Sequence, residues 1–203
     1  MSASRYVSRV VLAGALAWCS GAFGGFDHKV PFDESGIWDR DVQKGVQYTT
    51  VAVILGSALW EGGQTQLGRT SWQAVDSTII GAVTSEAAKR IFSRARPSQT
   101  DDPGKWFEGA GNESFPSGEV TLVSAAVAPF VFEYAKESPW VWALELLPLY
   151  DSVARVKSQA HWQTDVIAGW ALGTAAGYVA HAHGPFILQV LPHEFVVGIH
   201  QQW

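Results

Sequence analysis

The 203-residue sequence has one cysteine, Cys19, and one methionine, which opens the chain. A single cysteine excludes an internal disulfide, a cysteine-based zinc site and a redox centre made of paired thiols. Charged residues make up only 16% of the chain, compared with ~25% in ordinary soluble domains. Lysine and arginine form no run, and the formal net charge is −5. The sequence therefore predicts no nucleic-acid partner.

Long uninterrupted apolar runs are also absent, although 47% of the residues are apolar. The longest uncharged stretches of helical type, Val46–Trp60 and Val166–Ala180, fall short of the ~20 apolar residues that span a bilayer. These lengths favour buried core helices in a soluble domain. Tilted or flanked helices keep an integral membrane protein as the alternative.

The first 24 residues have the pattern of a targeting segment. Arg5 and Arg9 precede an apolar run, Val10–Trp18, which is followed by small residues up to Gly24. This layout is typical of a secretory signal peptide and predicts a periplasmic or secreted protein, with an N-terminal membrane anchor as the alternative. Residues 25–203 are then expected to form a single domain.

Five helical stretches are predicted after a polar, aspartate-rich surface lead-in over residues 25–44. Their ranges are 45–60, 72–93, 118–136, 139–152 and 163–182. The tail, residues 185–203, has β-branched and aromatic residues that are consistent with a short strand. The predicted fold class is therefore all-α, with a short C-terminal strand as an option.

A long loop over residues 97–116 is rich in glycine, aspartate and serine. Loops of this length in compact domains are usually functional or disordered. Its aromatic residues Trp106, Phe107 and Phe115 suit two roles equally, receiving a lipid tail or pinning the loop to the core.

The first cluster of residues that could take part in binding or catalysis runs from Lys89 to Pro97. Lys89 and Arg96 are seven residues apart, so we expect them on one face of a helix that Pro97 ends. Two cations at a helix end can hold a dianion such as phosphate. The alternative is a basic helix terminus that only complements the helix dipole.

The second cluster is Ser114-Phe115-Pro116-Ser117-Gly118-Glu119. Ser117 stands where the N-cap of the next helix belongs, and free N–H groups at a helix N-terminus bind anions. Gly118 would let a ligand approach the backbone closely. The alternative is simple capping, with Glu119 complementing the dipole.

The third cluster contains Arg155, His161 and Asp165. One helical turn separates His161 from Asp165, and an aspartate can fix the tautomer of a histidine nucleophile. Arg155 shares their face only if the chain breaks near Ser158–Gln159. The alternative is a histidine at an internal helix interface.

In order and spacing, the three clusters resemble the signature of the type 2 phosphatidic acid phosphatases, K-x6-R-P, P-S-G-H and S-R-x5-H-x3-D. That superfamily also contains bacterial non-specific acid phosphatases and vanadium haloperoxidases. The resemblance covers about residues 45–182. Two positions depart from the signature, because Glu119 replaces a histidine and Ala154 replaces a serine.

The resemblance implies a helical bundle with its site at the ends of the central helices. It implies that His161 attacks phosphorus to form a phosphohistidine and that Asp165 orients it. It further implies that the phosphate is bound by Lys89, Arg96, Ser117, Gly118 and Arg155. No metal or other cofactor is implied, and vanadate is expected to inhibit as a phosphate mimic.

The implied substrate is a phosphorylated small molecule, or a lipid phosphate or pyrophosphate met at a membrane surface. Glu119 takes the catalytic position of the family's second histidine, which protonates the leaving oxygen. A glutamate does so only when protonated, and nearby cations oppose that state whereas burial favours it.

Three outcomes follow for Glu119. It acts as an acid at low pH, or it is not needed because the leaving group is itself acidic. Otherwise the protein is a weak or silent phosphate-binding relative. A vanadium-dependent haloperoxidase is a further option within the resemblance.

Overall fold

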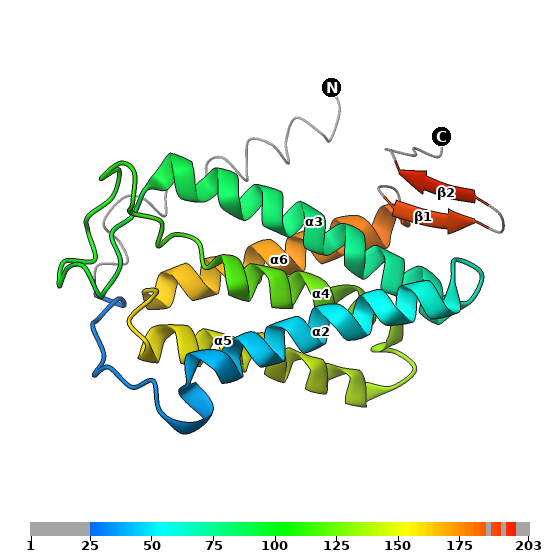
Figure 1. The fold of residues 1–203 in the computed structure, drawn as a ribbon, viewed down its shortest axis with the longest axis horizontal. Coiled ribbons are helices and arrows are strands. Elements are labelled where there is room, and N and C mark those ends of the chain that lie inside the picture. Colours follow the sequence, from blue (N-terminus) through cyan, green and yellow to red (C-terminus); the bar gives the residue numbers. More distant parts are fainter. Residues whose placement is uncertain (1–24, 186–187, 192–193, 198–203) are drawn as a thin grey trace.

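The computed structural model describes residues 25–185, 188–191 and 194–197 (Figure 1). The predicted targeting segment therefore lies outside the described residues. The five α-helices within them are α2 (Arg40–Glu61), α3 (Gln66–Phe92), α4 (Gly118–Tyr134), α5 (Leu146–Lys157) and α6 (Gln163–His183). Two 3-10 helices, η1 (Gly36–Trp38) and η2 (Pro139–Glu145), precede α2 and α5.

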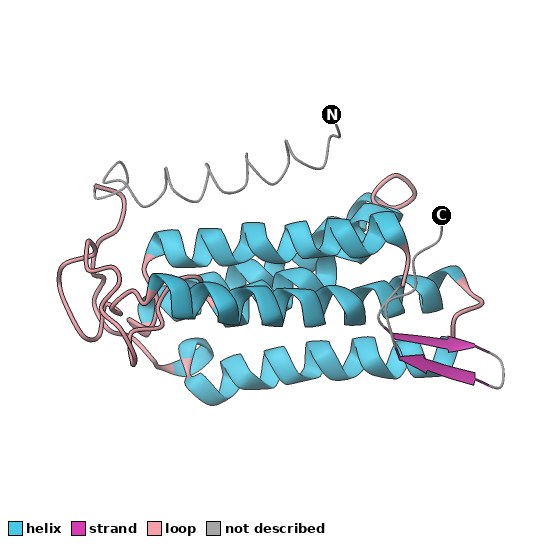
Figure 2. Cartoon of the chain, turned by 90° about the horizontal axis from the view of Figure 1, so that it is seen from above, coloured by secondary structure: helices cyan, strands magenta, loops and turns pink. Residues whose placement is uncertain are grey.

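The predicted all-α class is confirmed, and the tail holds the short strand expected there as one of a pair. Strands β1 (Leu188–Leu191) and β2 (Glu194–Val197) form an antiparallel hairpin in which Leu188 pairs with Val197. Figure 2 shows the helices along a common direction, with several interhelical loops gathered at one end. Among the described residues, no helix combines the length and the apolar character needed to cross a membrane.

Helix α2 begins five residues earlier than predicted, because Asp39 accepts a hydrogen bond from the Asp41 N–H at 2.8 Å and caps it. The expected surface lead-in over residues 25–44 is therefore wrong in part. Asp27 and Gln43, which belong to it, are buried. Helix α3 also begins early, since the Thr65 hydroxyl accepts from the Gly68 N–H.

The fourth predicted stretch is split between η2 and α5, and α5 continues to Lys157. The chain then leaves the helix, with Gln159 at a positive φ of 52°. The chain therefore has the break near Ser158–Gln159 that would let Arg155 share a face with His161, and the segment of His161 is separate from the helix of Arg155.

The loop aromatics pack mainly against one another and against the end of α3. Trp106 and Phe115 stack edge to face, with ring centroids 5.1 Å apart, and both contact Phe92. Of the two expected roles, these contacts match pinning of the loop. Phe107 also contacts Phe92 but stays exposed.

A stripe of glycines on α6 lets this helix lie close to α4. The stripe consists of Gly169, Gly173 and Gly177, spaced four residues apart on one helix face. A Cβ at Gly173 would lie 2.4 Å from the Thr121 carbonyl oxygen, and one at Gly169 would lie 2.6 Å from that of Ser117. The close approach brings the N-terminal turns of α4 and α6 together.

The Gly173→Ala substitution tests this contact, because it adds a methyl group against backbone atoms. We expect the unfolding free energy to fall by about 1–3 kcal/mol in urea denaturation. Gly56→Ala is the control, since Gly56 is exposed within α2 and no atom lies within 4 Å of its added Cβ. It should gain about 0.5–1 kcal/mol from helix propensity. Equal changes in both variants would contradict the close packing.

Candidate active site

The carboxylate of Asp165 is fully buried and lies at the centre of the polar network at the loop end of the bundle. Asp165 is in the first turn of α6, where it accepts the Trp162 N–H at 2.9 Å. It also accepts the Ser114 hydroxyl and, at 2.6 Å, Arg94 Nη1. Burial would raise the pKa of this carboxyl, but the neighbouring imidazole of His161, the charge of Arg94 and the Ser114 hydroxyl hold it below its ordinary value.

Arg94 is the buried counter-ion of this network. It donates to Asp165 and also to Asp27, each at 2.6 Å, and it lies 4.3 Å from the ring centroid of Trp106. Asp27 accepts both the N–H and the hydroxyl of Thr164. One guanidinium thus joins the N-terminal lead-in, the loop after α3 and the start of α6.

His161 precedes α6 and is only 3% exposed. Its Nδ1 lies 2.6 Å from the carbonyl oxygen of Ser114. Because a carbonyl only accepts, Nδ1 carries the proton and Nε2 keeps its lone pair. The nearest oxygen of Asp165 lies 3.9 Å from Nδ1, beyond hydrogen-bond distance. Asp165 therefore orients His161 through Ser114 and by its charge.

The environment of His161 keeps its imidazole neutral. Burial lowers its pKa to about 4, and the cations Arg155 and Arg96 act in the same direction against the carboxylate of Asp165. A neutral imidazole with a free Nε2 is the form that a nucleophile requires.

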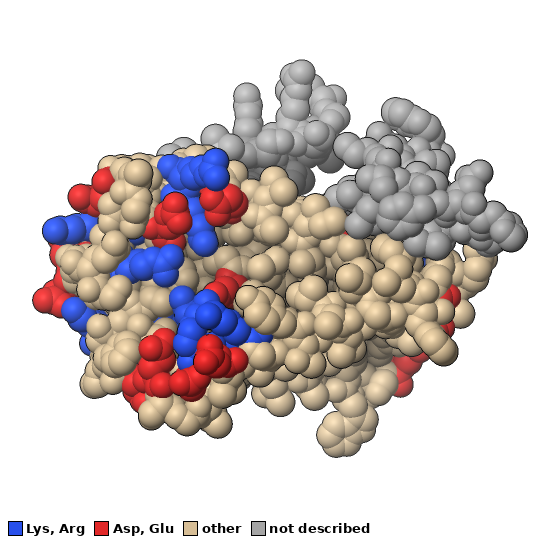
Figure 3. All heavy atoms as spheres, viewed as in Figure 1, with Lys and Arg blue, Asp and Glu red and all other residues tan. Residues whose placement is uncertain are grey.

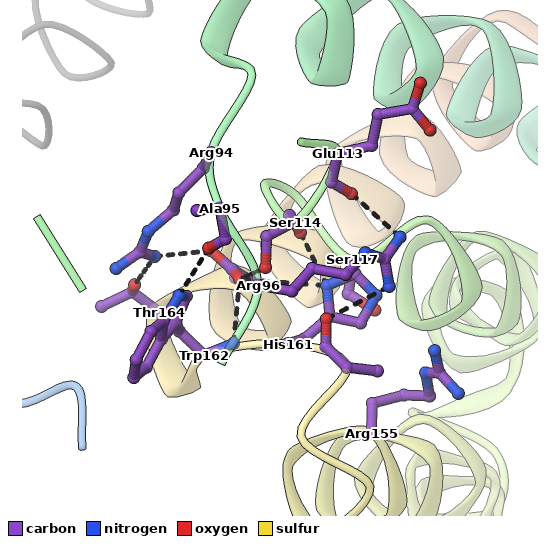
Figure 4. Close-up of polar contacts among 12 residues, drawn as sticks. Arg94, Ala95, Arg96, Glu113, Ser114, Ser117, Arg155, His161, Trp162 and Thr164 are labelled. Carbon is purple, nitrogen blue, oxygen red and sulfur yellow. Dashed lines mark hydrogen bonds and ion pairs between the residues drawn. The ribbon is translucent and has the colours of Figure 1, made fainter. Parts of the chain in front are cut away.

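The two cations of the first cluster reach the site from different elements, Lys89 from the last turn of α3 and Arg96 from the loop that follows it. Helix α3 ends at Phe92, and Ser93 adopts a left-handed conformation with a φ of 38°. The expectation that Lys89 and Arg96 share a helix face is therefore wrong, because Arg96 lies in the loop. Its guanidinium donates to the carbonyls of Ala160 and Glu113, which holds it beside His161 (Figure 4).

The N-terminus of α4 supplies the groups expected from the second cluster. Ser117 is the N-cap residue, as predicted, and its N–H donates to the Asp165 carbonyl. Within the described part of the chain, its buried hydroxyl has no hydrogen-bond partner. A Cβ at Gly118 would come 3.0 Å from Lys89 Nζ, so the glycine lets this ammonium approach the helix end.

Glu119 is held as an anion between two arginines. Arg40 donates to both of its carboxylate oxygens, and Arg155 Nε forms an ion pair with Oε2 at 3.0 Å. Burial raises the pKa of Glu119, but the hydrogen bonds from Arg40 and the charge of Arg155 outweigh it and lower the pKa overall. Near neutral pH the ionised carboxylate of Glu119 therefore has no proton to donate to a leaving group.

Asp151 lies one turn before Arg155 on α5 and is buried. Its Oδ2 has no hydrogen-bond partner among the residues that the structure describes. Burial raises the pKa of Asp151 to about 7, Glu119 adds to the rise, and Arg155 and Arg40 oppose it. The carboxyl is therefore protonated in mildly acidic solution.

Several residues of this site were not predicted. Arg94 had no local signal. Residues two apart in a straight extended segment point the same way, but here Arg94 donates to the buried Asp165 while Arg96 donates to the Ala160 carbonyl beside His161. Ser114 belongs to the second cluster but acts mainly through its carbonyl. Asp27, Arg40 and Gln43 have no local pattern that distinguishes them from surface polar residues.

No group of three or more His, Cys, Asp or Glu side chains with metal-binding geometry occurs in the described ranges. The structure instead brings together Lys89, Arg96, Arg155, Ser117 and Gly118 around the segment of His161. They come from the last turns of α3 and α5, the loop after α3 and the N-terminus of α4, which lie at the same end of the bundle (Figure 1).

Two solved structures share this fold. One is Aquifex aeolicus LpxE, with a TM-score of 0.51 and 16% identity over 68% of this chain and 82% of that chain. The other is a transmembrane PAP2-type phosphatidylglycerolphosphate phosphatase from Bacillus subtilis, with a TM-score of 0.52 and 16% identity over 73% and 77%. At this identity the likeness concerns the fold alone.

The PAP2 superfamily model matches residues 70–186, which is more than half of the chain. The chain therefore belongs to the PAP2 superfamily, in agreement with its three motifs.

Curated relatives point in the same direction. An undecaprenyl-diphosphatase from Sulfolobus acidocaldarius is 31% identical over 108 residues, 52% of this chain and 51% of that protein. A lipid A 1-phosphatase from Rhizobium etli is 33% identical over 102 residues, 48% of this chain and 43% of that protein. The chain spans about half or less of the length of these relatives.

The raised pKa of Asp151 predicts a pH-dependent stability. Because the folded state keeps this proton up to about pH 7 and the unfolded state only up to about 3.8, stability falls as pH rises between these values. Asp151→Asn has no proton to lose. Its unfolding free energy relative to the wild type should therefore rise by up to about 1.4 kcal/mol per pH unit in this window. A constant difference in urea denaturation from pH 4 to 8 would contradict the assignment.

Proposed function

We propose that this protein is a lipid phosphatase that forms a phosphohistidine at His161, and that a lipid diphosphate is its preferred substrate. The observation that carries the proposal is a buried, neutral histidine whose Nε2 is free, next to three cations at one end of a PAP2 bundle. The activities named for its relatives, an undecaprenyl-diphosphatase and lipid A 1-phosphatases, support the substrate class.

In the proposed reaction, His161 Nε2 attacks phosphorus, and the P–N bond forms as the P–O bond to the leaving group breaks. Lys89, Arg96 and Arg155 balance the charge of the transferred phosphoryl oxygens, and the Gly118 N–H and the Ser117 hydroxyl donate to them. Water then attacks phosphorus and breaks the P–N bond. Phosphate leaves, and the lone pair returns to Nε2.

The surroundings of Glu119 favour a leaving group that needs no proton. An alkoxide is a strong base and departs slowly unless an acid protonates it. The phosphate of a diphosphate is a weak base and departs as an anion. Because Arg40 and Arg155 keep Glu119 ionised, a phosphoanhydride suits this site better than a monoester.

The surface beside the site favours a substrate with an apolar chain. In Figure 3 the charged side chains of this face gather mainly at the loop end, and the adjoining helical surface is largely uncharged. A groove of about 720 Å³ lies between α2, α4 and the η2–α5 segment. Its lining includes Val42, Val46, Val53, Val127, Phe130 and Leu147. It begins beside the first turn of α2, which carries Arg40.

A silent phosphate-binding protein is the second candidate, and the ionised Glu119 is the observation that favours it. Such a protein would bind phosphate or vanadate at the same cations but would release no phosphate from any substrate. The assay that follows separates the two candidates.

Phosphate release should be measured with an isoprenyl diphosphate, an isoprenyl monophosphate and phosphatidate, with and without a chelator. We expect the diphosphate to have the highest kcat/KM, and His161→Ala to reduce turnover by about 10³-fold or more. The control is His183→Ala, at the exposed end of α6.

Three results would overturn parts of this proposal. Activity that survives in His161→Ala would rule out the phosphohistidine intermediate. Loss of activity with the chelator would rule out a reaction that needs no metal ion. No turnover of any substrate, together with vanadate binding, would establish the silent alternative.

A further inference from the structure

The first turn of α2 contributes to the site although it lies outside the matched family region, which begins at residue 70. Arg40 contacts Glu119 from 79 residues away, and Gln43 contacts Arg155 from 112 residues away. Neither residue belongs to the three motifs. Gln43 nevertheless contacts Arg155, one of the proposed phosphate-binding cations, and Arg40 contacts Glu119, which forms an ion pair with Arg155.

Gln43 has a fixed orientation beside the two arginines. It is only 2% exposed, and its Nε2 donates to the Trp38 carbonyl at 2.7 Å. This bond leaves Oε1 to accept, and it does so from Arg155 Nη1 at 3.2 Å and from Arg40 Nη1 at 3.3 Å. The guanidinium of Arg155 is therefore held by a hydrogen bond to Gln43, whereas its contact with Glu119 is an ion pair.

The charges in this cluster explain why Arg40 is needed. Arg155 is buried, and a carboxylate that was paired with it alone would cancel its charge and repel an incoming phosphate. Arg40 supplies a second cation and takes both oxygens of Glu119. Two guanidinium groups then face one carboxylate, so a net positive charge remains. Two more acidic groups act on the cluster, Asp151 from α5 and Glu34 from the segment before η1, and the positive charge of the cluster is largest while Asp151 is protonated.

We propose that Arg40 is a positioning residue that neutralises Glu119 and thereby leaves the charge of Arg155 to the substrate phosphate, while Gln43 fixes the direction of the Arg155 guanidinium. The inference rests on the proposed function, in which Arg155 binds phosphate. It gives Glu119 a role as an anion within the site in place of the proton donor that its position in the second motif suggests.

A double-variant cycle tests the charge balance through binding and needs no turnover. The dissociation constants of inorganic phosphate and of orthovanadate would be measured by calorimetry for the wild type, Arg40→Gln, Glu119→Gln and the double variant. Arg40→Gln should weaken binding by roughly tenfold or more, because Glu119 would then be paired with Arg155 alone and would cancel its charge. Glu119→Gln should tighten binding several-fold.

The double variant distinguishes charge balance from a structural role. It has the same net charge as the wild type, so we expect its affinity to return close to the wild-type value. Binding as weak as in Arg40→Gln, or weaker, would overturn the proposal. The control is Arg69→Gln, an exposed arginine near the opposite end of α3, which removes one positive charge without touching the site.

Other outcomes are equally decisive. If Arg40→Gln does not fold, Glu119→Gln alone decides. The proposal says that the Glu119 carboxylate opposes anion binding, so weaker anion binding in Glu119→Gln would overturn it. Unchanged affinity in Arg40→Gln would overturn the positioning role while the proposed function stands. A wild-type protein that binds neither anion would overturn the proposed function and this inference with it.

Discussion

The carboxylate of Asp165 is removed from water, and a buried charge is stable only where donors and an opposite charge surround it. Its three donors, Arg94, Ser114 and the Trp162 N–H, come from the loop after α3, the segment before α4 and the start of α6. Satisfying this one charge therefore fixes three separate segments relative to one another. Ser114 connects Asp165 to His161, because its hydroxyl donates to Asp165 and its carbonyl accepts the hydrogen bond from His161 Nδ1.

Close helix packing makes this network geometrically feasible. The glycine stripe of α6 lets α4 approach until the Ser117 N–H reaches the Asp165 carbonyl at 2.9 Å. The N-terminus of α4, with its free N–H groups, then faces the segment of His161. Packing far from the chemistry thus determines how an anion would lie beside the nucleophile.

Much of the fold could be predicted from local patterns. Apolar periodicity located the helices, and the motifs placed His161, Arg155 and the N-terminus of α4 in one site, including the break at Ser158–Gln159. Helix starts were less accurate, because the capping residues Asp39 and Thr65 extend α2 and α3 beyond their apolar segments.

The remaining differences come from long-range contacts that no local pattern encodes. A seven-residue spacing suggested one helix face for Lys89 and Arg96, but the left-handed Ser93 ends the helix between them. Burial of Arg94 depends on Asp27 and Asp165, which are distant in sequence. The partner of Glu119, Arg40, belongs to a segment that looked like a solvated lead-in, and only the folded chain brings the two together.

The proposed reaction depends on the Ser114 carbonyl, which keeps the proton of His161 on Nδ1 and leaves Nε2 as the nucleophile. The direct measurement is to quench the protein in base during turnover of a lipid diphosphate and to determine by NMR which ring nitrogen of His161 carries the phosphoryl group. We expect phosphorylation at Nε2. Phosphorylation at Nδ1 would contradict it, because that nitrogen would then have to give up its hydrogen bond to the Ser114 carbonyl.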